Sequence, residues 1–268
     1  MTTNAKLGDL LREITAHVIS LKRQVADAEH LQRTAERVHG YVEQKWPAHV
    51  VDVLGAEGAL LERLLAEQHP AAQLLRQALD SCRELARSNQ LQFPKLFEEA
   101  CATRIVLDRD SRHPKYSLEG GYLHAEIDDG RQVARVADLE TELAKLPSDA
   151  DAVVTVLVRE WNRLFGRPFD GAAVLGRVRR HYLAIVAKRK VTDGDSVPIR
   201  ALTRRMHENE AARVDEVLVD LGRLVDRGPH EIDGRRLDLQ QTKNTTQGAL
   251  LPGFTGRGYI GFICFKPS

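Results

Sequence analysis

The chain has 268 residues, of which 43% are hydrophobic and 29% are charged, and its formal net charge at pH 7 is +1. These values are typical of a globular protein with one large or two modest domains, and they exclude a disordered or fibrous chain. No run approaches the roughly 20 apolar residues of a membrane-spanning helix, and the N-terminal residues lack the apolar core of a signal peptide. We therefore expect a cytoplasmic protein without contact with a membrane.

The cysteines and histidines give no sign of a metal site. Cys82, Cys101 and Cys264 lie far apart in apolar surroundings, which favours buried thiols over a disulfide framework or a zinc site. The ten histidines are scattered and form no HExxH motif. We therefore expect no metal and no other cofactor.

Apolar residues recur near the N-terminus with alternating steps of four and three residues. This heptad seam predicts a helix of 30 or more residues that contacts a second helix, either within the chain or in another copy. Gln32 and His39 interrupt the register, while Leu31 and Val38 move the apolar stripe by one residue. Packing within the chain and a homodimer through this helix both remain open. The candidate partner-binding residues on the seam are Leu7, Leu11, Ile14, Val18, Leu21 and Val25.

Helical spacing continues through the first hundred residues. Leucines cluster at residues 60–65, and apolar residues repeat every three or four positions along residues 74–85. We predict a helical, coiled-coil-like interaction domain over residues 1–104. A second domain of helices and strands is expected over residues 105–268.

A β-hairpin is predicted near the middle of the chain. Strand-like runs at residues 122–127 and 133–136 flank Asp128, Asp129 and Gly130. An Asp-Gly pair between such runs is a strong hairpin signal, because both residues adopt positive φ angles readily. We include the hairpin in the second domain, although the sequence of residues 112–137 leaves its domain membership open.

Polar residues alternate with apolar ones along the first strand of this hairpin. Successive strand residues point to opposite faces, which places His124, Glu126 and Asp128 on one side. This pattern is typical of the outer face of a hairpin. Because carboxylates can also hold Mg²⁺, it leaves a metal-dependent nuclease as an alternative function.

Helical periodicity returns after the hairpin and reaches the C-terminal third. Val154, Leu157 and Trp161 share one stripe, and a further helix is expected to begin after Asp170, which suits an N-cap. Pro198 suits the first turn of the next helix. The last residues, 259–265, are apolar on both alternating faces and predict an interior strand.

Residues 197–239 read VPIRALTRRMHENEAARVDEVLVDLGRLVDRGPHEIDGRRLDL. Two amphipathic helices joined by a turn are followed by Gly228, which suits a helix stop, and by a hairpin with Asp233 and Gly234 at its turn. This order resembles a winged helix-turn-helix over about residues 197–241, with the hairpin as the wing. The resemblance implies a C-terminal winged-helix-like α/β module. No family is recognised for the whole chain.

The C-terminal third is the basic part of the chain. Residues 170–268 carry 17 basic and 12 acidic side chains, an excess of five positive charges, whereas residues 1–100 and 101–169 each carry two more acidic than basic side chains. A basic region of this kind favours contact with the phosphate backbone of nucleic acids. The candidate nucleic-acid-binding residues are Arg177, Arg180, Arg200, Arg204, Arg205, Arg235 and Arg236.

The second helix of the module is acidic instead. We expect Asp215, Glu216 and Asp220 on its exposed face, where carboxylates would repel the phosphates that line a DNA groove. These three residues are therefore candidate partner-binding residues. Arg235 and Arg236 at the hairpin tip are expected to contact phosphates without reading the base sequence.

These patterns predict a mostly helical α+β protein with a long heptad helix in its N-terminal domain and a winged-helix-like module in its C-terminal domain. The function that they favour is a non-enzymatic accessory or adaptor subunit of a DNA-associated multiprotein complex, for example with an ATPase or nuclease partner. Its winged helix would dock a protein and touch the DNA backbone. A winged-helix transcriptional regulator that binds DNA as a dimer is the first alternative, and a metal-dependent nuclease is the second.

Overall fold

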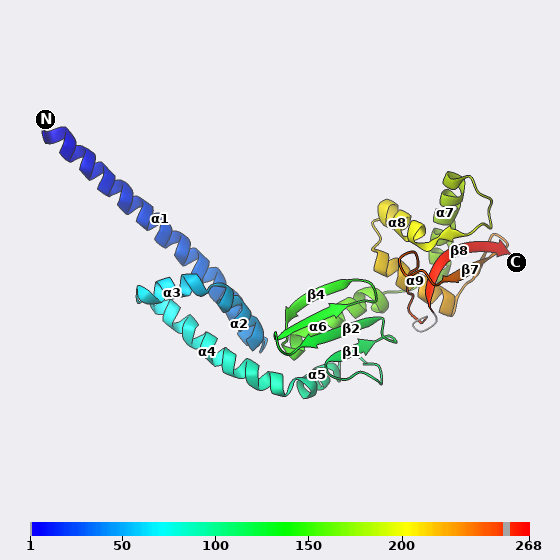
Figure 1. The fold of residues 1–268 in the computed structure, drawn as a ribbon, viewed down its shortest axis with the longest axis horizontal. Helices are drawn as coiled ribbons and strands as arrows, with labels where there is room; N and C mark the ends of the chain where they lie inside the picture. The colour runs from blue at the N-terminus through cyan, green and yellow to red at the C-terminus, as the bar shows by residue number, and fades with distance from the viewer. Residues whose placement is uncertain (1, 254–257) are drawn as a thin grey trace. The chain divides into compact units, whose positions relative to one another are not determined.

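The computed structural model describes residues 2–253 and 258–268, and it describes side chains for residues 10–253 and 258–268. The chain divides into two compact units, Met1–Phe93 and Pro94–Ser268 (Figure 1). Its class is α+β with a long N-terminal helix, as predicted. In the described part of the chain, no helix is both long and apolar enough to cross a bilayer.

The described residues of unit 1 form helices joined by short turns, without a strand. Pro47 and Pro70 stand in the first turn of two helices, where a missing N–H leaves no hydrogen bond unmade. The helices are α1 (Thr2–Glu43), α2 (Pro47–Ala56), α3 (Gly58–Ala66) and α4 (Pro70–Leu91).

The core of unit 1 joins the C-terminal half of α1 to α2, α3 and α4. Leu31 and Val38 are buried in one apolar cluster with Leu54 and other residues of the shorter helices. Ala35 and Val42, which would continue the heptad seam, are exposed. The predicted shift of the apolar stripe by one residue is therefore confirmed.

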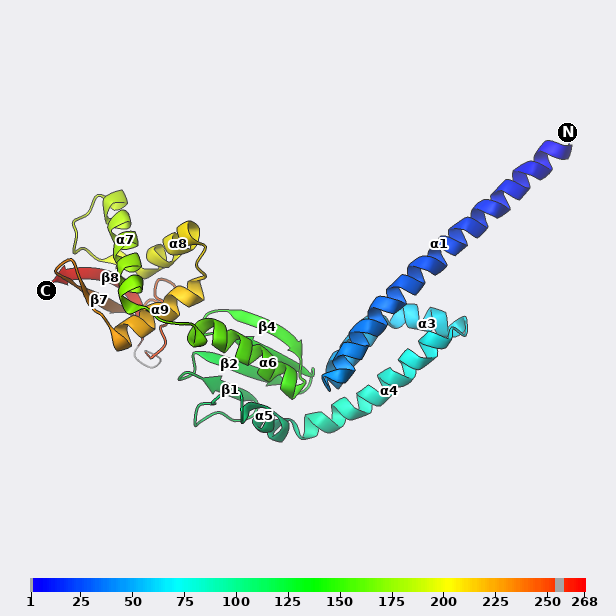
Figure 2. The same cartoon turned by 180° about the vertical axis from the view of Figure 1, so that it is seen from behind.

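The N-terminal half of α1 has no other element of unit 1 beside it in either view (Figures 1 and 2). The side chain of Leu7 lies outside those that the structure describes. Packing of the seam within the unit, one of the two options left open by the sequence, does not occur for its described residues. Their exposures are 56% for Leu11, 58% for Ile14, 44% for Val18, 59% for Leu21 and 59% for Val25.

Unit 2 begins within α5 (Phe93–Cys101) and continues into an antiparallel sheet with the order β1-β2-β3-β4. Helix α6 (Ala150–Trp161) lies along one face of this sheet in both views (Figures 1 and 2), and a π-helical segment, η1 (Asn162–Gly166), extends it. The strands are β1 (Lys115–Leu118), β2 (Leu123–Asp128), β3 (Val133–Ala137) and β4 (Glu142–Pro147).

The predicted central hairpin is the β2–β3 pair, and it belongs to unit 2. Its turn differs from the predicted one, because the positive φ angle, 54°, falls on Gln132 and not on Gly130. The connection is four residues long, and Asp128 closes it by accepting a hydrogen bond from the backbone N–H of Arg131 at 3.0 Å. The two-residue turn that an Asp-Gly pair favours is therefore not formed.

The C-terminal part of unit 2 packs three helices against a second antiparallel sheet with the order β5-β8-β7-β6. Strand β8 lies between β5 and β7, so the prediction of an interior C-terminal strand is confirmed. The helices are α7 (Gly171–Arg189), α8 (Ile199–Glu210) and α9 (Val214–Arg227), and the strands are β5 (Val197–Pro198), β6 (Glu231–Ile232), β7 (Arg235–Thr242) and β8 (Tyr259–Pro267).

Local sequence signals determine where these elements begin and end. The Asp170 carboxylate accepts a hydrogen bond from the Ala173 N–H at 3.0 Å and caps α7. Gly228 ends α9 with a φ angle of 70°, and Asp233 and Gly234 form the β6–β7 turn with φ angles of 53° and 65°. Each of these three predictions is confirmed.

Two apolar clusters hold unit 2 around α9. The larger one joins α7, α8 and α9 to the second sheet and includes Tyr182, Leu221 and Phe265. The smaller one contains Tyr122, Leu164 and Val219, so it joins α9 to the first sheet and to η1. Helix α9 is therefore covered on two sides.

Candidate nucleic-acid interface

Helix α9, the acidic helix of the module, is mostly buried. Asp215 and Asp220 are only 9% and 7% exposed, and Leu218, Val219 and Leu221 between them are buried as well. The expectation that these two carboxylates lie on an exposed face is wrong. The sequence of α9 does not reveal that its acidic side is covered by two arginines from a distant part of the chain, one in η1 and one directly after it.

These arginines, Arg163 and Arg167, bind the carboxylates of α9 directly. Arg163 contacts Asp215 at 2.6 Å and Glu216 at 3.0 Å, and Arg167 contacts Asp220 at 2.7 Å. Arg163 also contacts Glu160 of α6 at 2.8 Å, so one guanidinium joins three carboxylates. The acidic residues of α9 thus serve contacts inside unit 2.

The two buried carboxylates of α9 respond differently to their surroundings. Burial is the strongest influence on the pKa of Asp215 and raises it, but the hydrogen bond and charge of Arg163 outweigh burial, so the pKa lies below its ordinary value. For Asp220, burial outweighs the charge of Arg167, and the pKa lies above its ordinary value. The surroundings therefore favour the charged form of Asp215 and disfavour the charged form of Asp220.

The loop after β7 also approaches α9 closely. A Cβ atom on Gly222 would lie 2.9 Å from Cδ and from the carbonyl oxygen of Pro252. Only glycine fits between the helix and this loop without displacement of the backbone. Because α9 is covered by η1, by the larger core and by this loop, it is unable to enter a DNA groove as it stands.

Several arginines of the C-terminal region are neutralised within the protein. Arg177 contacts Glu210 at 2.8 Å, and Arg235 contacts Asp193 at 2.9 Å. Arg200 forms two hydrogen bonds with Glu140, at 2.6 and 2.8 Å. These three predicted binding residues therefore already have internal carboxylate partners.

Arg179 is the most buried of these cations. Its side chain is 7% exposed, contacts both oxygens of Asp193 at 2.7 Å, and lies 4.8 Å from the ring centroid of Phe265. The hydrogen bond with Arg179 is also the main reason why the pKa of Asp193 lies below its ordinary value. Arg179 and Asp193 form a structural pair.

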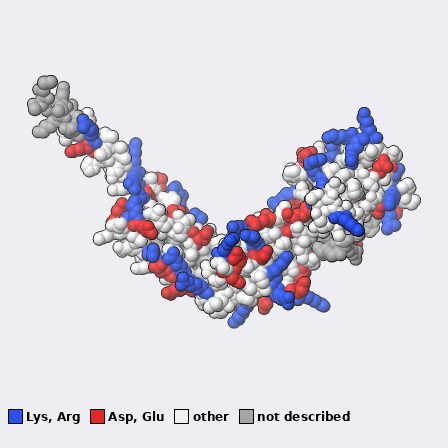
Figure 3. Space-filling model, in the orientation of Figure 1, with Lys and Arg blue, Asp and Glu red and all other residues white. Residues whose placement is uncertain are grey.

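Other cations line an open groove between the C-terminal end of α7 and α8. This α7–α8 groove has a volume of about 560 Å³, and Glu208 is the one acidic residue in its lining. Figure 3 shows basic side chains gathered over this part of unit 2. The lining residues are Ile185, Lys188, Arg189, Pro198, Arg200, Ala201, Arg204, Arg205 and Glu208.

Four cations of the α7–α8 groove form no ion pair within the described chain: Lys188, Arg189, Arg204 and Arg205. Arg205 is half-buried, and its Nε atom is buried without a hydrogen-bond partner. An unpaired buried donor costs free energy, which an anion in the groove would offset. The groove therefore has the chemistry of a phosphate-binding surface.

Helix geometry explains why these side chains meet. Lys188 and Arg189 stand in the last turn of α7, where the helix dipole favours positive charge. Arg200 and Arg204 are four residues apart, so they lie one above the other on α8 together with the neighbouring Arg205. Arg204 and Arg205 were predicted from the sequence as nucleic-acid-binding residues, and both line the α7–α8 groove.

Four of the seven predicted binding residues lie outside the lining of the α7–α8 groove, namely Arg177, Arg180, Arg235 and Arg236, and two lining residues were not predicted. Arg180 and Arg236 are exposed but do not line the α7–α8 groove. Lys188 and Arg189 do line it, although from the sequence they were only counted among the 17 basic side chains of residues 170–268. Their spacing of three and four residues from Ile185, which lines the same groove, is the signal that could have identified them.

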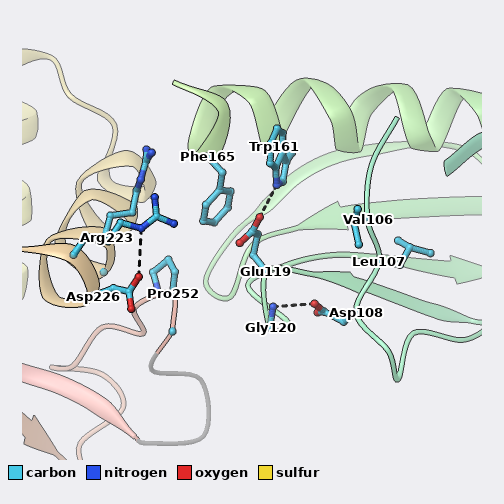
Figure 4. A pocket seen from close by; sticks show the side chains of 13 residues that line it. Val106, Leu107, Asp108, Glu119, Gly120, Trp161, Phe165, Arg223, Asp226 and Pro252 are labelled. Carbon is cyan, nitrogen blue, oxygen red and sulfur yellow. Dashed lines mark hydrogen bonds and ion pairs between the residues drawn. The ribbon is translucent and has the colours of Figure 1, made fainter. Parts of the chain in front are cut away.

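A second cavity of about 610 Å³ lies between the first sheet and α9 (Figure 4). Its charged residues already have partners in unit 2. Glu119 accepts a hydrogen bond from Trp161 Nε1 at 2.7 Å, Asp108 accepts one from Gly120 N–H at 3.0 Å, and Asp226 contacts Arg227 at 3.4 Å. This cavity therefore offers an anion fewer unpaired cations than the α7–α8 groove does.

The predicted polar face of β2 is present. His124 and Asp128 are partly exposed and Glu126 is fully exposed, while the residues between them are buried. Among the described residues, no group of three or more His, Cys, Asp or Glu side chains is placed to hold a metal ion. Comparisons with family models, curated proteins and solved structures found no match to this chain.

Proposed function

We propose that this chain is a non-enzymatic accessory subunit of a DNA-associated complex and that its α7–α8 groove binds the phosphate backbone of DNA. The observation that carries the proposal is the set of four cations without internal counter-ions, Lys188, Arg189, Arg204 and Arg205, around one groove. Elsewhere in the same region, arginines such as Arg179 are neutralised by carboxylates. Unpaired cations at a groove are suited to an external polyanion.

We further propose that α8, α9 and the β6–β7 hairpin form a winged-helix-like module used for assembly. In DNA readers of this kind, the second helix of the module enters the major groove. Here that helix, α9, is packed against η1 through the Arg163–Asp215 and Arg167–Asp220 pairs. This packing supports backbone contact through α8 over base reading through α9.

The expected binding is weak and independent of base sequence. Four cations that each neutralise one phosphate release about four counterions, so the logarithm of the binding constant should fall with the logarithm of salt concentration with a slope of about −3 to −4. Dissociation constants of about 10⁻⁶ to 10⁻⁴ M are typical of such binding at physiological salt. This low affinity is sufficient for an accessory subunit, because the other subunits of the complex also bind the DNA and raise the overall affinity.

Fluorescence anisotropy with two duplexes of unrelated sequence, measured over a salt series, tests the proposal. We expect equal affinity for both duplexes and a reduction of the slope by about two when Lys188→Ala and Arg204→Ala are combined. The matched control combines Arg180→Ala and Arg236→Ala, which removes two exposed cations outside the groove and should leave the slope nearly unchanged. Undetectable binding, or equal losses in both double variants, would disprove the assignment of the groove.

A further inference from the structure

The N-terminal half of α1 carries an apolar face that the rest of unit 1 leaves uncovered. We define the α1 seam as Leu11, Ile14, Val18, Leu21 and Val25, which are 44–59% exposed. Asp27, which follows the seam, contacts Arg63 of α3 at 2.7 Å. Five large apolar side chains in a row on a solvent-exposed helix mark a contact surface.

We propose that a second copy of this chain covers the α1 seam and that the two helices form a parallel, two-stranded coiled coil. The steps of four and three residues place Leu11, Val18 and Val25 at the a positions of a heptad and Ile14 and Leu21 at the d positions. Each copy then supplies the same apolar ladder. Val18 at a with Leu21 at d favours two parallel strands, whereas Leu11 at a with Ile14 at d is a combination that shifts the preference to higher oligomers. The proposal of a dimer depends on the Val18–Leu21 heptad.

The area of the α1 seam is in the range that a dimer needs. Each seam side chain and the neighbouring exposed Leu10 leaves on the order of 70 Å² of accessible surface in solvent. With the stems of flanking polar side chains, two helices would bury on the order of 1,000 Å², the lower limit for a stable interface. The contact is therefore expected to be reversible and to depend on concentration.

The flanking residues permit two identical helices to approach. In a parallel pair, each g residue faces the e residue five positions later in the other chain, so Leu10 faces Thr15, His17 faces Lys22 and Gln24 faces Glu29. No two carboxylates and no two Lys or Arg side chains face each other along residues 10–29. Apart from a protonated His17 beside Lys22, self-association therefore meets no like-charge repulsion at these positions.

The length of the seam is limited by the core of unit 1. From Leu31 onward the buried stripe of α1 shifts by one residue and faces α2, α3 and α4. The described seam thus spans little more than two heptads. A short coiled coil of this kind predicts a dissociation constant in the micromolar range.

Sedimentation equilibrium of the full chain, without nucleic acid, tests the proposal over protein concentrations from about 1 to 100 µM, which bracket the expected constant. We expect a monomer–dimer equilibrium in the wild type and at least a tenfold weakening in Val18→Glu. The control is Ala16→Glu, an exposed position on the opposite face of α1, which should leave the equilibrium unchanged. Circular dichroism checks that both variants keep their helices.

Mixing two variants tests the orientation. Val18→Glu and Val18→Lys each fail to pair with themselves, but position 18 faces position 18 only in a parallel pair, so an equimolar mixture should recover the dimer. A wild type that stays monomeric, a dimer that Val18→Glu leaves intact, a trimer or tetramer, or a mixture that fails to associate would each overturn the proposal. None of these outcomes depends on the binding of DNA by unit 2.

Discussion

Helices α8 and α9 are neighbours in sequence and in one core, yet their charges have opposite uses. Asp215 and Asp220 of α9 are buried. Arg163 of η1 binds Asp215, and Arg167, the residue after η1, binds Asp220. Arg204 and Arg205 of α8 line an open groove without a carboxylate partner in the described chain. One helix uses charge to hold the fold together, and the other leaves it available to a ligand.

This comparison teaches that the number of charges on a helix says little about its partner. The acidic residues of α9 suggested an external protein, but their partners are 49–53 residues away in the same chain. The two helices differ in whether a side chain of opposite charge from another element contacts their charged residues. Arginines contact the carboxylates of α9, but no carboxylate of the described chain contacts Arg204 or Arg205 of α8. The comparison can be tested by removing charges from each side.

Loss of Arg163 should have the largest effect on stability. Arg163→Ala leaves Asp215 and Glu160, both with side chains about 9% exposed, without their shared cation. Removing one partner of a buried pair costs about 3–5 kcal/mol of unfolding free energy. Denaturation by urea, followed by circular dichroism, measures the loss.

The matched control is Arg159→Ala in α6, the helix that η1 extends. Arg159 also contacts Glu160, at 2.9 Å, but its side chain is 63% exposed. Solvent screens such a contact, so the variant should lose less than about 1 kcal/mol. Equal losses in the two variants would mean that the α9 carboxylates are not held as the structure indicates.

The pH dependence of stability gives a second, smaller test of the same contact. Because the pKa of Asp215 is below its ordinary value in the folded protein, its stabilising contribution is present above about pH 4 and is lost as the pH falls below that value. In Arg163→Ala the strongest interaction that opposes burial is lost, and only Arg213 and the Glu216 N–H remain to lower the pKa of Asp215. The pKa of Asp215 therefore rises, and protonation relieves a buried charge that has lost its nearest cation.

The difference in unfolding free energy between wild type and Arg163→Ala should therefore shrink between pH 7 and pH 3. Urea denaturation at several pH values measures it, and Arg159→Ala should follow the wild type throughout. A difference that stays constant over this range would exclude Asp215 as the partner that matters.

Loss of Arg204 from α8 should have the smallest effect on stability. Its side chain is exposed and forms no ion pair in the described chain, so Arg204→Ala should change the unfolding free energy by less than about 0.5 kcal/mol. The same substitution should weaken DNA binding and reduce the salt slope by about one. A large loss of stability would show that Arg204 belongs with the structural cations and not with the groove.

Much of the local structure of the chain could be predicted from short stretches of sequence. The Asp170 cap, the Gly228 helix end and the Asp233–Gly234 turn depend on backbone angles and on hydrogen bonds within a few residues. The long helix and the interior C-terminal strand follow from apolar spacing. These features need no knowledge of distant parts of the chain.

The exposure of the charged residues could not be predicted in the same way. Arg163 meets Asp215 only because Tyr122, Leu164 and Val219 pack η1 against α9, and that contact joins residues almost 100 positions apart. The groove forms only because the C-terminal end of α7 lies beside α8, and the sequence of neither helix determines that arrangement. The site was therefore predicted as a basic region, and its individual residues only in part.

The uninterrupted path of α1 from the exposed seam into the core of unit 1 has a consequence for length variation. Each residue turns an α-helix by 100°, so a single insertion between Val25 and Leu31 would rotate the seam far from its present direction relative to the core. An insertion of seven residues would turn it by only about 20°. An insertion of eleven residues turns it by a similarly small angle, so this stretch of the chain should tolerate insertions of seven or eleven residues better than an insertion of one.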